Sequence, residues 1–280
     1  MHPLKAVLNP FIRTMSSNKL TWTPFSALVR IGNWLDFKKL QHDGDIAEEK
    51  LKRLYADGKV KGGFFEGLRY ASMKSVYSSL YPKLFGSYEI ELYPVLQEFN
   101  KNDYRNILDI GCAEGYYAVG LAMKFPHAKV YAYDIEPEAL RLCSELAIHN
   151  NVQDRVILGE KCSSDTLEKF GFSGRSLIVS DCEGYERELF TKDNIGKLGS
   201  VDLIIELHSF VYRDVKEYLV ELFAPSHDHE LISSFDTARK LFDFKPFMEN
   251  MTKAEQMKVI DEKRPFTMEW LILKPKKSNG

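Results

Sequence analysis

One short stretch, residues 106–116, restricts the fold of this 280-residue chain more than any other. Its largely apolar run at 107–110 has the length and composition of a central parallel strand that is covered on both faces. Gly111 and Gly115 follow, and a missing side chain lets the backbone bend sharply and lets a ligand approach closely. A helical pattern begins directly afterwards. The stretch therefore predicts a buried strand, a tight glycine turn and a helix, the corner at which open α/β sheets bind ligands.

The residues of this turn indicate which ligand it can take. A pyrophosphate loop has the pattern G-x-G-x-x-G, but here Cys112 stands at the second glycine position and the glycines lie four residues apart. Asp109 and Glu114 would repel a pyrophosphate and would suit a cationic ligand. An ordinary strand–turn–helix corner without a ligand is the alternative interpretation.

The segment 109–115 resembles the motif acid-x-Gly-x-(Gly/Ala)-x-Gly of class I S-adenosylmethionine (SAM)-dependent methyltransferases, with Ala113 in place of the commoner middle glycine. SAM carries a sulfonium and an ammonium group and no phosphate, which agrees with an acidic loop. The resemblance implies that SAM is the cofactor. It also implies that the following loop residues contact it: Asp109, Gly111, Ala113, Glu114, Gly115 and Tyr116.

Strand and helix patterns alternate from residue 106 onward. The expected strands are 106–110, 129–134, 155–158, 176–180 and 201–206, with a last pair at 230–233 and 267–273 that encloses a helical insert at about 236–264. This alternation predicts an α/β fold, a Rossmann-like doubly wound sheet of seven strands with helices on both faces. The resemblance implies that the last strand is antiparallel. We expect a helical N-terminal region and lid at 1–100, and a SAM-binding methyltransferase domain at 101–280.

Ligands of open parallel sheets bind beyond the carboxyl ends of the strands. Asp134 follows the second strand, 25 residues after Asp109, where an acid binds the ribose hydroxyls in this architecture. It could instead cap the next helix. The resemblance places the residues after the third strand near the adenine. Lys161 and Cys162 are therefore expected to contact the cofactor, and further contacts are expected from Tyr88, Ile135 and Asp181.

Asp181, Glu206 and His208 follow the fourth and fifth strands, so they should converge. We predict that they form the methyl-transfer site, with His208 as the general base because an unperturbed histidine titrates near neutral pH. In a second interpretation the three side chains hold Mg²⁺, which would lower the pKa of a bound hydroxyl. In a third, His208 only forms a hydrogen bond within its loop.

The segment 181–186 has the pattern Asp-x-Glu-Gly-x-Glu and resembles the FkbM-like family, which methylates hydroxyl groups of sugars and natural products. The Asn/Asp-Pro-Pro-Tyr motif of many nitrogen methyltransferases is absent from this position. The resemblance covers about residues 105–275 and implies a SAM-dependent O-methyltransferase with a small hydroxylated acceptor. A protein or RNA methyltransferase, and a SAM-binding interaction module without catalysis, are the alternatives.

A stretch rich in glycine and aromatic residues, 61–89, has a composition that is costly to order unless it covers something. We expect a lid over cofactor and acceptor, although an irregular connector would have a similar composition. Aromatic rings there could stack on a sugar, and basic side chains could hold an anionic group of the acceptor. The expected substrate residues are Arg69, Tyr70, Lys83, Glu183 and Tyr185.

Composition limits the partners and the compartment. The net charge of −2 gives no broad basic field, so no nucleic-acid partner is expected. The four cysteines lie far apart, which argues against a zinc site and fits a cytoplasmic location. No apolar run reaches the length of a transmembrane helix. Trp22, Phe25 and Trp34 lie in a helical N-terminal segment; they could form a membrane-surface or partner face, including a homodimer face, or pack against their own domain.

Overall fold

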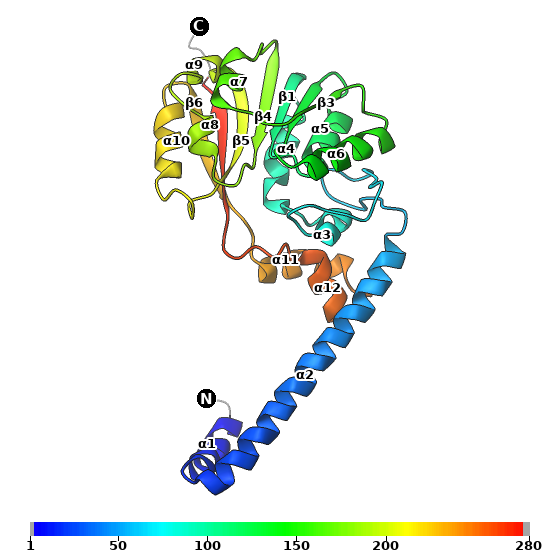
Figure 1. The fold of residues 1–280 in the computed structure, drawn as a ribbon, viewed down its shortest axis with the longest axis vertical. Helices are drawn as coiled ribbons and strands as arrows, with labels where there is room; N and C mark the ends of the chain where they lie inside the picture. The colour runs from blue at the N-terminus through cyan, green and yellow to red at the C-terminus, as the bar shows by residue number, and fades with distance from the viewer. Residues whose placement is uncertain (1–2, 277–280) are drawn as a thin grey trace.

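The computed structural model describes residues 3–276, excluding the side chains of residues 3–8 and 11. Its centre is a seven-stranded sheet with the strand order β3-β2-β1-β4-β5-β7-β6 (Figure 1). Strands β1 to β5 pair in parallel, whereas β7 runs antiparallel to both of its neighbours. The strands are β1 (Tyr104–Ile110), β2 (Lys129–Tyr133), β3 (Val156–Gly159), β4 (Arg175–Ser180), β5 (Val201–Leu207), β6 (His227–Ser233) and β7 (Glu269–Pro275).

This topology confirms the α/β, Rossmann-like sheet with an antiparallel last strand. The central strand β1 is enclosed on both faces: Ile107 belongs to one hydrophobic cluster and Leu108 to another. Neighbouring strand residues point to opposite faces, so a run of apolar residues needs cover on both sides. The largest difference from the predicted bounds is at β6, which begins at His227 rather than residue 230.

Helices provide this cover on the two faces of the sheet (Figure 1). On one face, α5 (Tyr116–Lys124) and α6 (Pro137–His149) pack over β2 and β3. On the other, α10 (Val215–Phe223) contacts β6 and α8 (Glu186–Leu189). Two further short helices connect the strands, α7 (Ser164–Lys169) and α9 (Ile195–Leu198).

The N-terminal region begins with α1 (Pro3–Ser16) and α2 (Lys19–Leu54), and α2 leaves the body as a long rod (Figure 1). Near the body, α2 packs against α12 (Lys253–Ile260), where Lys50 Nζ lies 2.9 Å from Glu255 Oε2. Within residues 3–276, no helix combines the length and the apolar content needed to cross a bilayer. The remaining elements are α3 (Leu80–Phe85), η1 (Ile90–Leu92), α4 (Tyr93–Phe99), α11 (Thr237–Asp243) and η2 (Lys245–Phe247).

Candidate active site

Three residues of the loop after β1 adopt left-handed backbone conformations. The φ angle is 85° at Gly111, 47° at Ala113 and 94° at Gly115. The amide N–H groups of Gly111 and Cys112 both donate to the Tyr133 carbonyl, at 2.8 and 2.9 Å. Left-handed backbone explains why glycine suits these alternate positions, and Ala113 occupies one of them despite the steric cost of its Cβ.

Gly111 is the position where this loop tolerates a side chain least. A Cβ atom there would lie 1.7 Å from the Asp181 carbonyl oxygen. Because both backbones are fixed by paired strands, we expect Gly111→Ala to lower the free energy of unfolding by ~3 kcal/mol or more. Denaturant unfolding measures this loss. Gly196→Ala is the control, since nothing lies within 4 Å of its Cβ; equal stability of the two variants would contradict the close approach.

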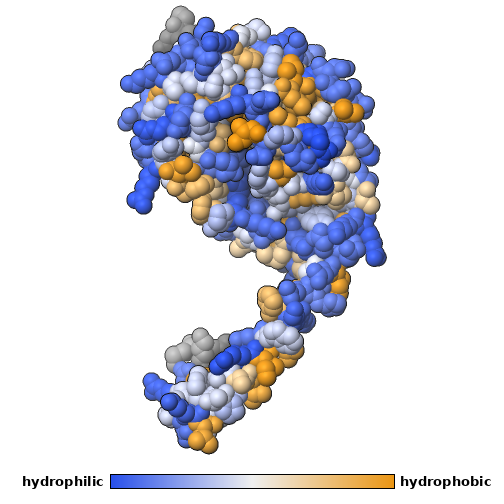
Figure 2. Space-filling view, viewed as in Figure 1, coloured by the Kyte–Doolittle hydropathy of each residue, from blue (hydrophilic) through white to orange (hydrophobic). Residues whose placement is uncertain are grey.

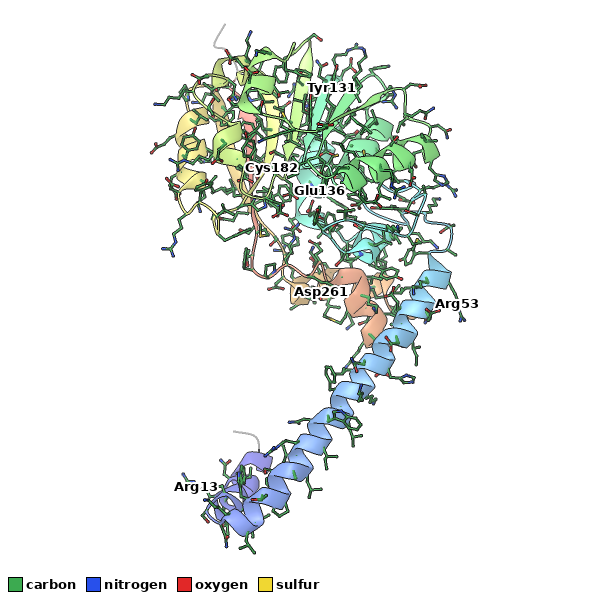
Figure 3. All side chains as sticks on the ribbon, in the orientation of Figure 1. Arg13, Arg53, Tyr131, Glu136, Cys182 and Asp261 are labelled. Atoms are coloured by element: carbon green, nitrogen blue, oxygen red, sulfur yellow. The ribbon has the colours of Figure 1, made fainter. Side chains whose placement is uncertain are left out.

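A cavity of about 660 Å³ opens beside this loop. Its size lies within the range of pockets that bind cofactors and drug-sized ligands. Figure 3 shows two of its lining residues, Glu136 and Cys182, at the centre of the body. The predicted cofactor residues that line the cavity are Tyr88, Asp109, Gly111, Ala113, Tyr116, Asp134, Ile135, Lys161, Cys162 and Asp181.

The chemistry of this cavity suits a cationic cofactor such as SAM. Asp109 Oδ2 is buried and has no hydrogen-bond partner among the described residues. Burial raises the pKa of Asp109 to about 8, and a bound cation would favour its ionised form. Asp134 accepts hydrogen bonds from the N–H groups of Ala113, at 2.8 Å, and Glu136, at 2.9 Å. Each of its oxygens keeps a lone pair that can accept from a ribose hydroxyl.

Glu114 and Gly115, two of the expected cofactor residues, are not among the residues that line this cavity. Glu114 is buried and accepts hydrogen bonds from Lys83 Nζ at 2.6 Å, Tyr70 Oη at 3.0 Å and the Val76 N–H at 3.0 Å. Its carboxylate therefore anchors the segment 61–89, which we call the covering segment because Val76, Tyr77 and Lys83 line the cavity. Gly115 instead allows close helix packing, because a Cβ there would lie 2.6 Å from Cys143 Sγ of α6.

Three of the expected substrate residues, Arg69, Tyr70 and Lys83, lie in or near the same network. Lys83 lines the cavity, but its charge is already paired with Glu114. Tyr70 is buried and does not line the cavities described for this structure. Arg69 also lies outside them: its side chain is exposed, and its backbone N–H and C=O pair with the Asn150 side chain at 2.9 and 2.8 Å. These three residues thus support the covering segment.

The other two expected substrate residues, Glu183 and Tyr185, do line the large cavity. Lys161 Nζ lies 4.5 Å from the centre of the Tyr185 ring. Of the aromatic residues in the covering segment, Tyr77 and Tyr88 line the cavity as well. The rings that lie over the cavity are therefore fewer than the sequence suggests, because other aromatic residues of this segment belong to the hydrophobic core.

Lys83 and Glu114 form a buried ion pair, with exposed side-chain fractions of 3% and 2%. Removing one partner leaves an uncompensated buried charge, so we expect Lys83→Met to lower the free energy of unfolding by ~3–5 kcal/mol. Adding Glu114→Gln removes the second charge and should recover a large part of that loss. Denaturant unfolding of the single and double variants measures both effects. A Lys83→Met protein as stable as the wild type would show that the pair does not anchor the covering segment.

A smaller cavity, of about 190 Å³, adjoins the large one. The two share part of their lining, including Tyr88, Asp181 and Glu183. The shared residues show that the two cavities are neighbours. The remaining walls of the smaller cavity include Glu206, His208, Phe210, Glu262, Arg264 and Phe266.

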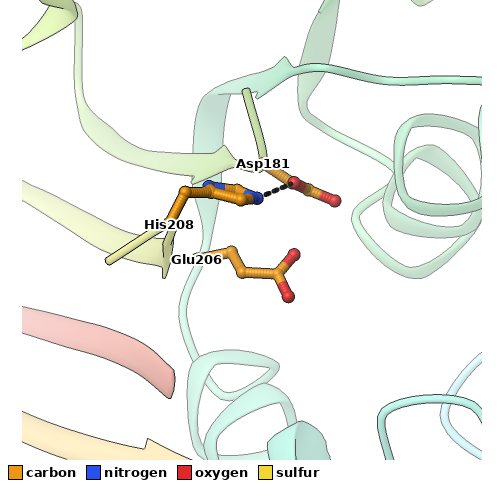
Figure 4. Close-up of side chains that lie close together, drawn as sticks. All are labelled: Asp181, Glu206 and His208. Atoms are coloured by element: carbon orange, nitrogen blue, oxygen red, sulfur yellow. Dashed lines mark ion pairs between the residues drawn. The ribbon is translucent and has the colours of Figure 1, made fainter. Parts of the chain in front are cut away.

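The predicted transfer residues Asp181, Glu206 and His208 come together at this smaller cavity (Figure 4). Asp181 follows β4, while the other two lie at the end of the adjacent strand β5. His208 Nε2 lies 3.4 Å from Asp181 Oδ1 and 3.6 Å from Glu183 Oε2. Its Nδ1 lies 2.5 Å from Glu186 Oε1. Neighbouring parallel strands thus bring a histidine among three carboxylates.

These carboxylates change the protonation of His208. Burial alone would lower the pKa of His208, but Asp181 and Glu186 raise this pKa to about 10. The imidazole is therefore protonated at neutral pH, which disfavours His208 as the general base. Burial would raise the pKa of Asp181, but His208 holds it below its usual value. At neutral pH the ionised base beside the cavity wall is thus Asp181.

Three residues of this cluster had no predicted role: Glu89, Glu186 and Arg264. Arg264 pairs with Glu206 and with Glu89 Oε1, the latter at 2.5 Å. Burial raises the pKa of Glu89 to about 7, and Arg264 offsets only part of this rise. Glu186 ends the Asp-x-Glu-Gly-x-Glu pattern, so the sequence held a signal for it. Arg264 follows α12, far along the chain from Glu89 and Glu206, and no local pattern marks it.

Asp181, Glu206 and His208 also form a candidate metal-ligand set, since one ligand atom from each lies within 4.8 Å of the others. The local charges oppose a cation. Arg264 already pairs with Glu206, and His208 is protonated at neutral pH. Mg²⁺ moreover prefers oxygen ligands. The donor set therefore fits Mg²⁺ poorly.

Comparison with known proteins points to one class. The model of the methyltransferase small domain (MTS) matches residues 93–180. A tRNA (guanine-N(7)-)-methyltransferase of Schizosaccharomyces pombe is 23% identical over 168 residues, which cover 57% of this chain and 58% of that protein. A release factor glutamine methyltransferase of Deinococcus radiodurans is 33% identical over 91 residues, 32% of this chain and 30% of that protein. The structure of an rRNA methylase from Streptococcus thermophilus has a TM-score of 0.46 at 12% identity and covers 67% of this chain and 97% of that chain.

The match to the family model of the methyltransferase small domain and the sheet topology together indicate the class I SAM-dependent methyltransferase fold. The matched residues run from α4 to the end of β4, so they include the glycine loop, Asp134 and much of the large cavity. The match ends before Asp181. It therefore does not extend to the transfer cluster, and the chain spans less than two thirds of the length of either relative.

Proposed function

We propose that this protein is a SAM-dependent O-methyltransferase that methylates a hydroxyl group of a small acceptor, such as a sugar or a natural product. The observation that carries the proposal is the wall shared by the two cavities, where Tyr88, Asp181 and Glu183 face both. A methyl group that leaves the large cavity would meet an acceptor oxygen in the small one. The meeting point lies beside an ionised carboxylate.

Bound SAM supplies an electrophilic methyl group on a sulfonium. The protein has to hold an acceptor oxygen in line with that carbon and to take up the hydroxyl proton. We assign the proton to Asp181, whose partly exposed side chain lines both cavities. His208 keeps this carboxylate ionised, and Glu186 fixes the orientation of the imidazolium through Nδ1. His208 and Glu186 are positioning residues in this account.

The pH dependence of turnover distinguishes Asp181 from His208 as the base. The pKa of Asp181 is held below its usual value, so this carboxylate stays ionised across the neutral range. We therefore expect kcat/KM for the acceptor, measured at saturating SAM, to change less than about threefold between about pH 6.5 and 8.5. With His208 as the base, its pKa of about 10 would make kcat/KM rise about tenfold per pH unit through this range. Such a rise would show that His208, and not Asp181, is the general base.

The family resemblance at 181–186 adds to the proposal that the reaction is O-methylation of the FkbM-like kind. The residues of this pattern lie at the transfer cluster: Asp181 and Glu183 line both cavities, and Glu186 contacts His208. Phe210 and Phe266 line the small cavity with ring centres 5.0 Å apart, and such rings can stack on a sugar. We propose no Mg²⁺ in the reaction, and assays with EDTA should give the same rate as assays with Mg²⁺.

A protein or RNA methyltransferase is the second candidate, and the names of the two curated relatives favour it. The residues after β4 argue against it. Asp181, Cys182 and Glu183 stand where many nitrogen methyltransferases carry Asn/Asp-Pro-Pro-Tyr. A SAM-binding module without catalysis is disfavoured by the carboxylates gathered at the ends of β4 and β5.

The acceptor class can be tested with SAM that carries a radiolabelled methyl group. The protein is incubated separately with pools of hydroxylated small molecules, with tRNA and with protein, and Asp181→Asn serves as the inactive control. We expect label in a small molecule, held as a methyl ether that survives mild base. If the wild type labels tRNA or protein and Asp181→Asn does not, the acceptor is a macromolecule and the proposed small acceptor is wrong.

A further inference from the structure

The active site does not explain the N-terminal hairpin, which we define as α1 and the outer part of α2, residues 3–42. α2 has 36 residues, and a helix of this length spans about 54 Å. Every residue from 27 to 42 is exposed, while the buried residues of α2, Ala47 and Leu51, lie closer to the body. Figure 1 shows the hairpin standing away from the sheet and its covering helices.

The exposed part of α2 is rich in large apolar side chains. Leu28, Trp34 and Leu40 expose 67%, 56% and 70% of their surface. Figure 2 shows apolar side chains along the outer part of this rod. Such side chains on a free surface mark a site of interaction. The other large apolar side chains exposed along this part of α2 are Leu20, Trp22, Val29, Ile31, Leu35 and Phe37.

These apolar side chains are not confined to one side of the helix. An α-helix turns about 100° per residue, so Leu28, Ile31 and Leu35 share one side, whereas Val29 and Leu40 lie on the other. A coiled coil with a second copy would require a single apolar stripe. Apolar residues on several sides instead suit the interfacial region of a bilayer, where lipid contacts a partly embedded helix on more than one side.

The charge of residues 9–40 provides a second argument for lipid as the partner of the hairpin. Residues 9–40 hold five basic residues and one acidic residue, a net charge of +4. The whole chain has a net charge of −2, so the remainder carries −6. An anionic surface would attract the hairpin and repel the body. The charged residues of the segment are Arg13, Lys19, Arg30, Lys38, Lys39 and the acid Asp36.

We propose that the N-terminal hairpin binds the protein to an anionic membrane by embedding partly in the interfacial region of the bilayer. The hairpin combines exposed aliphatic residues, basic residues and two tryptophans, Trp22 and Trp34, and tryptophan favours the headgroup level of a bilayer. Of the two N-terminal interpretations, packing of Trp34 against its own domain does not occur, since its side chain is exposed. The inference is independent of the methyl-transfer proposal, because the hairpin contributes no lining residue to the two cavities of the candidate active site.

Flotation of the full chain tests the proposal. The probes are vesicles of phosphatidylcholine alone and vesicles that also contain phosphatidylserine. We expect the protein to float with the anionic vesicles at least tenfold more than with the neutral ones, and less at high salt. The triple variant Leu28→Ser, Trp34→Ser, Leu40→Ser should float with the anionic vesicles at least tenfold less than the wild type. Phe242→Ser is the control, because Phe242 is equally apolar and 79% exposed on α11.

Tryptophan fluorescence provides a readout from the hairpin itself. The chain has three tryptophans, and Trp270 is already buried at 1% exposure. Anionic vesicles should therefore shift the emission of the wild type to shorter wavelength. The variant Trp22→Phe, Trp34→Phe should still float but lose the shift. A wild type that stays unbound would overturn the proposal; so would a dimer without vesicle binding that the triple serine variant converts to a monomer, which would assign this surface to a second copy.

Discussion

Asp181→Asn is expected to lower the turnover number by about 10²–10⁴-fold, the range that a positioned proton acceptor contributes. The amide has the size of the carboxylate but cannot accept the hydroxyl proton. SAM affinity should change by less than about tenfold, because Asp109 and Asp134 continue to line the large cavity. The measurement is turnover together with calorimetric SAM binding on the same preparation.

The control for this prediction is Asp165→Asn. Asp165 is an exposed carboxylate on α7 that pairs with Lys169, and it lies outside both cavities. Near-normal turnover in Asp181→Asn would remove Asp181 from the chemistry. A loss of SAM binding equal to the loss of turnover would show that this carboxylate acts on the cofactor alone.

Asp134→Ala is expected to weaken SAM binding by about 10–100-fold, the value of one or two hydrogen bonds to a charged group. Two effects add in this variant. The ribose hydroxyls lose their acceptor, and the Ala113 N–H, which donates to Asp134 Oδ2 at 2.8 Å, loses the partner that holds the glycine loop. Titration calorimetry with SAM measures the dissociation constant.

Glu138→Ala is the matched control for Asp134. Glu138 lies in the first turn of α6, four residues along the chain, and pairs with the exposed Arg141. Its removal should leave SAM affinity unchanged. Unaltered SAM affinity in Asp134→Ala would mean that Asp134 serves only to hold its loop.

The glycine loop and the order of elements could be predicted from the sequence because their signals are local. The spacing of Gly111 and Gly115 reflects left-handed backbone at these two positions. The apolar run of β1 likewise shows that both of its faces are covered. The convergence of Asp181 with His208 follows from the rule that parallel strand ends meet at one edge.

The environment of each side chain could not be predicted in the same way. Glu114 belongs to the loop motif, yet its carboxylate turns to Lys83, which lies 31 residues earlier and approaches only after the covering segment folds. His208 has a pKa of about 10 because Asp181 and Glu186 surround it. From residue type alone, His208 is expected to be a base that is neutral near pH 7. Its tertiary contacts with Asp181 and Glu186 instead keep it protonated as an imidazolium.

The most direct test of the central claim is a calorimetric titration of the purified chain with SAM, with NADH as the control ligand. The fold and the acidic cavity predict saturable binding of SAM in the micromolar range and no binding of NADH. If the covering segment closes only over an acceptor, SAM binding appears when candidate acceptors are added. Absence of SAM binding both with and without acceptors would contradict the account and would make the glycine loop a structural corner.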